Sequence, residues 1–322
     1  MKYLFFDIEC ASVFKNTAKI CAFGYCLTDE QFHILEKEDV LINPLGNFHL
    51  TDRKGEQGIV LPYKYADFKK YPTFLSQAER IYSLLQAEDT LVFGHASMND
   101  VKYLNLESKR FSLPSFSFSF GDTQFLYMNK IGDFSKQLGL GSIAKELGVE
   151  FLPHRAVDDA YATMRVAEEM CKQAGLSLEK LLKKYEITLG RIENYEVIQN
   201  TSAPFEKYKA EREKQKRKRE SLRAEFHIFA DKEKRKREKG GALKNETVCF
   251  SHALELELPL AKKLLSAAFS KGARVTFKAE ECSVYVCLNG EDGQRLKSAR
   301  ERGAKIVSAK EFERELGVKE NG

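Results

Sequence analysis

A strongly charged stretch from about Pro204 to Gly241 constrains this chain most, because it separates two regions that each carry patterns of buried structure. Residues 206–239 contain 15 Lys and Arg against 8 Asp and Glu, a net charge of +7, whereas the whole chain carries +5. The rest of the chain is therefore slightly acidic. Such a run is typical of a solvated helix or a disordered linker. It is also typical of an arm that contacts nucleic-acid phosphates, and the two interpretations are compatible. The cations that we assign to such an arm are Lys214, Lys216, Arg217, Lys218 and Arg219.

The composition excludes several classes of protein. With 322 residues, 43% of them hydrophobic, the chain can form more than one core, which argues against disorder throughout. Its seven cysteines form no Cys-x-x-Cys pair, so no zinc knuckle or redox motif is present and a reducing compartment is expected. The N-terminus reaches Asp7 too early for a signal peptide, and no apolar run approaches the roughly 20 residues of a membrane span. We therefore expect a cytoplasmic protein without a membrane partner.

The region before the charged stretch alternates strands with helices. Tyr3 to Ile8 form a short apolar run, which is typical of a buried strand, and two further strands are expected on either side of a turn at Asp29-Glu30. A helix is expected after the N-cap Thr73, with one apolar face formed by Leu75, Ala78, Ile81, Leu84 and Leu85. A strand over residues 90–93 and helices from Asn99, over 140–147 and over 157–174 follow. This pattern predicts an α/β domain with a mixed sheet.

Residues 116–120 alternate Phe and Ser strictly. The period of two predicts a half-buried strand. The alternative is an exposed aromatic platform on which nucleic-acid bases stack.

Carboxylates occur at three separated places in this region. Asp7 and Glu9 lie two apart on the first expected strand, so their side chains point to the same face, where they repel each other unless a cation neutralises them. The alternative is a strand end at which both acids reach solvent. Asp100 opens a helix directly after a strand, and taken alone it also suits an ordinary first-turn acid. His154 precedes a long amphipathic helix that carries Asp159, and a structural role is open to both.

Taken together, these residues resemble the DEDDh branch of the DEDD 3′→5′ exonucleases, which are DnaQ-like proteins. The motifs Phe6-Asp7-Ile8-Glu9, His95 to Asp100 and His154 to Asp159 stand in the family's order. Asp122-Thr123 and the leucine-rich residues 138–147 also resemble family features, and the likeness covers about residues 1–175. It implies an RNase H-like fold, a mixed sheet flanked by helices.

The resemblance also implies a mechanism with two Mg²⁺ or Mn²⁺ ions, which prefer hard oxygen ligands. The implied metal ligands are Asp7, Glu9, Asp100 and Asp159, with Asp7 bridging both ions, and His154 is the implied base. The sequence departs from the family in Cys10-Ala11-Ser12, where Thr-Thr-Gly is common, and in Asn99, where Phe is frequent. Neither change removes a ligand, but both alter the surface around the terminal nucleotide.

The implied function is hydrolysis of nucleic acid from a free, single-stranded 3′ end to nucleoside 5′-monophosphates. DNA is the favoured substrate, and an RNA-trimming exoribonuclease is the alternative. A polymerase-bound editing enzyme and a non-catalytic nucleic-acid-binding adaptor remain open. Four converging acids argue against the adaptor, because a scaffold does not need them.

The region after the charged stretch has the βαββαβα order of a BRCT domain and resembles one at Lys271-Gly272-Ala273 and over residues 299–307. The Trp usual in the last helix is missing, and Phe312 is expected to fill its space. Ser251 would be the phosphate-contacting hydroxyl, with Arg295 or Lys297 as its cation, although a generic α/β module with surface charges fits equally. Such domains bind phosphopeptides, DNA ends or partner proteins, and this resemblance alone favours DNA repair. The expected domains are thus an exonuclease domain (1–175), a helical basic linker (176–244) and a BRCT-like domain (245–317).

Overall fold

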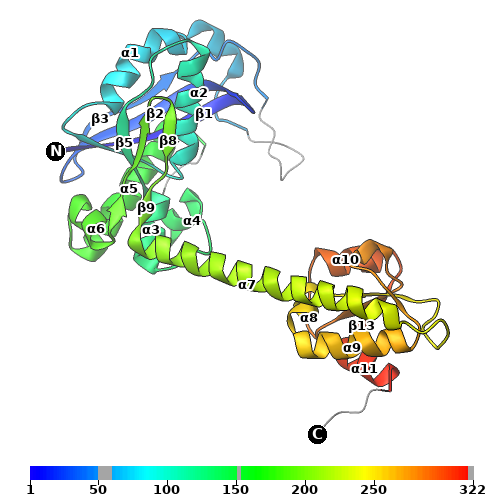
Figure 1. Ribbon diagram of the computed structural model, residues 1–322. Helices are drawn as coiled ribbons and strands as arrows, with labels where there is room; N and C mark the ends of the chain where they lie inside the picture. The colour runs from blue at the N-terminus through cyan, green and yellow to red at the C-terminus, as the bar shows by residue number, and fades with distance from the viewer. Residues whose placement is uncertain (50–59, 151–153, 318–322) are drawn as a thin grey trace. The chain divides into compact units, whose positions relative to one another are not determined.

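The computed structural model describes residues 1–49, 60–150 and 154–317 (Figure 1). The chain divides into two compact units, Met1–Lys209 and Ala210–Gly322, here called the first and second units. Helix α7 (Ala203–Glu233) begins in the first unit and ends in the second. Within the described residues, no helix is long and apolar enough to cross a membrane.

The first unit is built on a seven-stranded mixed sheet in the order β3-β2-β1-β4-β5-β7-β8. The pairs β1–β4 and β4–β5 are parallel, and the remaining neighbours are antiparallel. The turn between β2 and β3 lies at the expected place, where the Asp29 carboxylate accepts hydrogen bonds from two backbone N–H groups. The strands are β1 (Lys2–Phe14), β2 (Thr17–Asp29), β3 (Ile34–Leu41), β4 (Thr90–Gly94), β5 (Phe118–Asp122), β7 (Gly190–Glu193) and β8 (Glu196–Ile198).

Helices cover both faces of this sheet. Alternate residues of β1 point to opposite faces: Leu4, Phe6 and Ile8 pack with α1 and α2, whereas Tyr3 and Phe5 pack with α3, α4, α5 and α6. The predicted α/β domain with a mixed sheet flanked by helices is therefore confirmed. The helices are η1 (Tyr65–Lys70), α1 (Phe74–Leu85), α2 (Met98–Arg110), α3 (Thr123–Ile131), α4 (Leu140–Leu147), α5 (Ala156–Ala174) and α6 (Leu178–Lys184).

Two details of the first unit differ from the sequence predictions. The buried stripe of α1 is Phe74, Ala78, Ile81 and Leu85. The predicted face is therefore confirmed at Ala78, Ile81 and Leu85, and it was wrong at Leu75, which is 52% exposed. The second difference is a set of short strands between residues 187 and 202, where a helical linker was expected. They are β6 (Ile187–Thr188), β7, β8 and β9 (Thr201–Ser202), and two of them extend the main sheet.

The alternating Phe residues are buried. Phe116, Phe118 and Phe120 are at most 8% exposed, while the serines between them reach solvent. The prediction of a half-buried strand is confirmed, and an exposed platform for stacking bases is excluded at this place.

The second unit holds a four-stranded parallel sheet in the order β11-β10-β12-β13. Its core includes Phe226 and Ala230, so the C-terminal part of α7 belongs to this unit. Gly272 and Gly303 follow helices with φ of 85° and 81°, as expected for C′ glycines, and Phe312 of the last helix is buried against Phe250. The elements are β10 (Thr247–Phe250), β11 (Arg274–Val275), β12 (Val284–Cys287), β13 (Lys305–Ser308), η2 (Lys234–Lys236), η3 (Ala279–Glu281), α8 (His252–Leu256), α9 (Leu258–Ser270), α10 (Gln294–Glu301) and α11 (Ala309–Glu315).

Candidate active site

The centre of the site is the end of β1. Asp7 and Glu9 continue the face of β1 on which Tyr3 and Phe5 are packed, so the apolar surface is replaced by two carboxylates. Both side chains are half-buried. The period of two in a strand places them on one face, as the sequence predicted.

Helix α5 brings a third carboxylate to this place. Asp159 lies in the first turn of α5, and α5 packs on β1 and β2. Ligand oxygens of Asp7, Glu9 and Asp159 all lie within 4.8 Å of one another. Three acids from two separate elements thus converge on one point.

Asp100 is the fourth predicted carboxylate and lies in the first turn of α2, 6% exposed. The three-residue group above does not include it, but its charge contributes to the raised pKa of Asp7. Burial raises its own pKa, and the charge of Glu9 raises it further, whereas a hydrogen bond from the backbone of Ile8 opposes this. The Asp100 carboxylate therefore lies beside β1, near Asp7 and Glu9.

Asp122 fixes the turn from which α2 starts. Its carboxylate accepts hydrogen bonds from the backbone N–H groups of Ala96 at 3.1 Å and Ser97 at 3.0 Å, just before α2. The same side chain caps α3 by accepting from Gln124 and Phe125. The Asp-Thr pair that the sequence singled out thus joins the starts of α2 and α3, and so places Asp100.

The carboxylates of this site ionise with difficulty when no cation is present. Burial, followed by the charges of Asp159 and Asp39, raises the pKa of Glu9 to about 8. Burial raises the pKa of Asp159 to about 6, against the opposing effects of the His154 backbone N–H group and the His154 charge. Burial and four neighbouring acids raise the pKa of Asp7 well above its ordinary value. A divalent cation would offset this repulsion, and clustered carboxylate oxygens are the donors that Mg²⁺ and Mn²⁺ prefer. The residues present therefore fit such ions.

His154 lies at the edge of the site. Its side chain is exposed, its φ is 72°, and its backbone N–H donates to Asp159 Oδ2 at 2.9 Å. The hydrogen bond ties the residue to the carboxylate cluster, while the imidazole remains accessible from solvent.

Sequence reasoning missed three residues of this region. Asp39 on β3 is another acid next to the cluster, since its charge raises the pKa of both Asp7 and Glu9. Its carboxylate is bound by Arg155 and by the hydroxyl of Tyr63. No local pattern marks Asp39, because its position depends on the register of β2 and β3. Arg155 could have been noticed in the sequence, because it lies between His154 and Asp159.

The five cations assigned to a nucleic-acid-binding arm lie on α7, where residues 209–220 are all exposed. Arg217 pairs with Glu213 at i, i+4, with Nε 3.2 Å from Oε1. The region is helical in the structure. Lys214, Lys216, Arg217, Lys218 and Arg219 therefore share one solvated helical segment.

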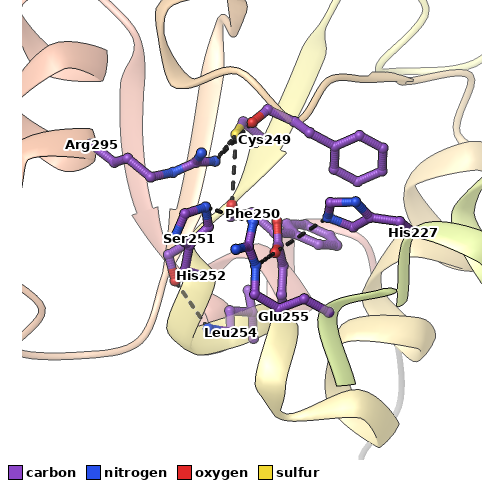
Figure 2. A network of polar contacts seen from close by, with 10 residues as sticks. His227, Cys249, Phe250, Ser251, His252, Leu254, Glu255 and Arg295 are labelled. Carbon is purple, nitrogen blue, oxygen red and sulfur yellow. Dashed lines mark hydrogen bonds and ion pairs between the residues drawn. The ribbon is translucent and has the colours of Figure 1, made fainter. Parts of the chain in front are cut away.

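Among the described residues, no hydrogen bond joins Ser251 to Arg295, although both lie in the polar network of the second unit (Figure 2). Ser251 is fully buried, and its hydroxyl donates to Glu291 at 2.6 Å and accepts from the Leu254 backbone N–H at 3.1 Å as the N-cap of α8. Arg295 donates to Cys249 Sγ at 3.3 Å and to the Phe277 carbonyl at 3.0 Å. Lys297 is exposed and no contact joins it to Ser251 among the described residues. The expected hydroxyl–cation pair is thus replaced by internal contacts.

The same part of the second unit holds a buried polar network (Figure 2). Glu255 is fully buried, and Arg223 Nε of α7 lies 2.7 Å from its Oε2. His227 Nε2 lies 3.4 Å from the same oxygen, and Arg223 contacts His252 Nε2 at 2.8 Å. The His227 ring stacks on Phe277 with centroids 3.8 Å apart. This network attaches α7 to α8.

Known proteins that resemble this chain include two exonucleases of solved structure. A search of curated proteins gives no significant match. Among solved structures, the chain is similar to a 3′-exonuclease described in the 3′-end specific recognition of histone mRNA stem-loop, with 15% identity and a TM-score of 0.47, over 63% of this chain and 71% of that one. It is also similar to E. coli exonuclease I in complex with a dA16 oligonucleotide, with 19% identity and a TM-score of 0.44, over 57% of this chain and 43% of that one.

The family model for the RNase T type, described as exonuclease, matches residues 4–167. This range is just over half of the 322 residues and contains all four carboxylates and His154. The chain therefore belongs to the RNase T exonuclease family.

Proposed function

We propose that this protein is a metal-dependent 3′→5′ exonuclease of the DEDDh type that releases nucleoside 5′-monophosphates. The observation that carries the proposal is the convergence of Asp7, Glu9 and Asp159, whose oxygens lie within 4.8 Å of one another. The buried Asp100 lies near Asp7, and its charge contributes to the raised pKa of Asp7. Family membership supports a nuclease. Two Mg²⁺ or Mn²⁺ ions held by these four carboxylates would supply electrostatic stabilisation of the attacking and leaving oxygens of the phosphodiester.

His154 is the proposed general base. Its exposed imidazole can meet a water molecule that approaches a bound phosphodiester, and histidine is the side chain most often used for such a proton transfer. The carboxylates are committed to the cations, so they are poor candidates for this proton. The hydrogen bond from the His154 backbone N–H to Asp159 keeps the base next to the ligands.

The proposed substrate is single-stranded DNA with a free 3′ end. The preference for DNA rests on the BRCT-like character of the second unit, which we also propose. Its order of strands and helices matches the expected one apart from the short helices α8 and η3. RNA trimming is the second candidate. A DNA repair role, a protein partner of the second unit and a cytoplasmic location accompany the first candidate as predictions.

The exposed segment of α7 is the proposed nucleic-acid-binding arm. Its five cations face solvent on one helix and can neutralise phosphates along a strand without reading the bases. We therefore expect the arm to raise affinity for longer substrates and not to set sequence preference.

The test is degradation of 5′-labelled single-stranded DNA and RNA of identical sequence by the full chain, with Mg²⁺, Mn²⁺ or EDTA. The expected result is a ladder that shortens from the 3′ end, faster for DNA, lost in EDTA and strongly reduced in His154→Ala. A faster RNA ladder would support the exoribonuclease. Tight binding without cleavage under any metal would support a non-catalytic adaptor and contradict the proposal.

A further inference from the structure

Three positions on neighbouring strands form a row across the sheet. Asp7 of β1 is paired with Gly24 of β2, and Gly24 is paired with Asp39 of β3. Directly opposed residues in antiparallel strands point to the same face. The carboxylates of Asp7 and Asp39 therefore flank a place on the sheet that carries no side chain.

The start of α5 occupies this place. A Cβ atom added to Gly24 would lie 2.0 Å from the carbonyl carbon of Ala156 and 2.1 Å from the backbone nitrogen of Val157. No side chain fits there, so the backbone of the first turn of α5 lies directly on β2. The glycine thus allows the approach that brings Asp159 to Asp7 and Glu9.

The first turn of α5 lacks an ordinary cap. Its N-cap residue is Arg155, which makes no side-chain cap hydrogen bond, and arginine has no acceptor to offer. The hydroxyl of Tyr63 instead accepts from the Ala156 backbone N–H at 3.2 Å. A residue 93 positions earlier in the chain therefore satisfies a free N–H group at the start of this helix.

Asp39 completes the attachment. Its Oδ2 accepts from the Tyr63 hydroxyl at 3.0 Å and from Arg155 Nε at 3.1 Å, and its side chain is only 7% exposed. The negative charge also lies near the N-terminus of α5, which the helix dipole favours. Asp39 thus orients the Tyr63 hydroxyl, which caps Ala156, and it also holds the side chain of Arg155.

We propose that Asp39, Tyr63 and Arg155 form a clamp of positioning residues that hold the first turn of α5 on Gly24, and with it Asp159 and His154. The proposal rests on the proposed function, because it assigns these residues to the same site. They act through Asp159: the clamp fixes Ala156, and the His154 backbone N–H binds Asp159 Oδ2 on the other side of the turn. Groups that orient metal ligands without touching the metal commonly change metal affinity or activity by about 10- to 100-fold when removed.

The test compares Tyr63→Phe with Tyr65→Phe in the full chain. The Tyr65 hydroxyl also accepts a backbone N–H, from Leu61 at 3.0 Å, in the same segment but outside the clamp. For Tyr63→Phe we expect the Mn²⁺ dissociation constant, measured by calorimetry, to rise about tenfold. We also expect faster hydrogen exchange at Ala156, and a kcat about tenfold lower with KM nearly unchanged. Asp39→Asn, which keeps an acceptor oxygen, should retain most of the activity that Asp39→Ala loses.

Two results would overturn the clamp. The first is a Mn²⁺ dissociation constant and kcat of Tyr63→Phe equal to those of Tyr65→Phe. The second is a loss in Asp39→Asn as large as in Asp39→Ala, which would make Asp39 a metal ligand. Mn²⁺ affinity and hydrogen exchange do not depend on cleavage. A wild-type protein without nuclease activity, but with Mn²⁺ affinity sensitive to Tyr63→Phe, would therefore contradict the proposed function and support the clamp.

Discussion

Each unit contains a cluster of buried and half-buried ionisable side chains, and the two clusters differ in whether they contain a counter-charge. In the first unit, Asp7, Glu9, Asp100 and Asp159 are all acids, and burial together with the neighbouring acids raises the pKa of Asp7 and Glu9. In the second unit, the fully buried Glu255 lies 2.7 Å from Arg223. Among the described residues, the four acids of the first cluster are not balanced by basic side chains. In the second cluster, Arg223 balances the charge of Glu255.

This difference separates a site from a structural network. Clustered like charges cost folding free energy unless a ligand neutralises them, so such a cluster indicates an external cation. A buried acid paired with an arginine already has a counter-charge, and the pair joins the elements that carry the two partners. Removing one charge should therefore leave the stability of the metal-free first unit unchanged or higher, and it should lower the stability of the second unit.

The largest expected effect is loss of activity in Asp7→Asn. Metal-assisted stabilisation of the reacting oxygens is worth several kcal/mol, so we expect kcat to fall by about a thousandfold. The Tm in EDTA should remain the same or rise, because a carboxyl group whose ionisation is unfavourable is replaced by a neutral amide of the same size. Oligonucleotide cleavage and thermal unfolding measure both effects. Full activity in Asp7→Asn would contradict the assignment of the acidic cluster in the first unit as a metal site.

The second effect concerns Glu255→Ala, which leaves Arg223 without its buried partner. We expect the second unit to lose about 3 kcal/mol, the lower end of the range for broken buried pairs, because Arg223 is one third exposed. Cleavage of short oligonucleotides should stay within about twofold of wild type, since the change lies outside the first unit. The exposed Glu257→Ala is the matched control in denaturant unfolding, and an equal effect of both variants would refute the network.

Removing the metal should make stability depend on pH. The pKa of Glu9 is raised to about 8 and that of Asp159 to about 6, both above the values of about 4 expected in the unfolded chain. The folded chain then holds protons that the unfolded chain releases. The free energy of unfolding is therefore highest below about pH 4 for these groups and falls as pH rises to about 8.

In EDTA we expect the Tm of the first unit to fall by several degrees between about pH 5 and about pH 8. Excess Mg²⁺ should remove most of this decrease, and Glu9→Gln should reduce it. Differential scanning calorimetry measures it. A Tm that rises with pH in EDTA would mean that the pKa values of these acids are not raised in the folded chain.

The smallest expected effect follows from replacing Lys214, Lys216, Arg217, Lys218 and Arg219 by Gln. We expect KM for long single strands to rise several-fold with kcat unchanged. The slope of log affinity against log salt concentration should become shallower by roughly 0.7 for each phosphate that the helix no longer neutralises. A variant with Lys214, Lys216 and Lys218 changed to Arg retains the charge and should behave as wild type. An unchanged salt dependence would mean that these cations do not contact phosphates and only keep the helix solvated.

Local periodicity predicted where the individual acids of the site lie on their strand and helix. Spacing of two on a strand put Asp7 and Glu9 on one face, and the position of Asp159 at the start of an amphipathic helix put it where a helix can meet that strand. The convergence itself followed from the family resemblance, because no local pattern reports which elements meet.

The features that were missed depend on tertiary structure. The clamp at Asp39 and Tyr63 requires the register of β2 with β3 and a segment that folds back over α5, neither of which a sequence pattern reveals. Strands β6 to β9 contain only two to four residues each, too few for a periodic signal. Ser251 fits a ligand-binding hydroxyl by position, but the fold buries it as a helix cap.

The most direct measurement of the central claim is a count of Mn²⁺ ions bound per chain, by electron paramagnetic resonance, in the presence of a nucleoside 5′-monophosphate. We predict two ions bound by the wild-type protein, and loss of both from the tightly bound population in Asp7→Asn. Equal numbers of tightly bound ions in the two proteins would contradict this claim, because the like-charged cluster of the first unit would then not be the metal site.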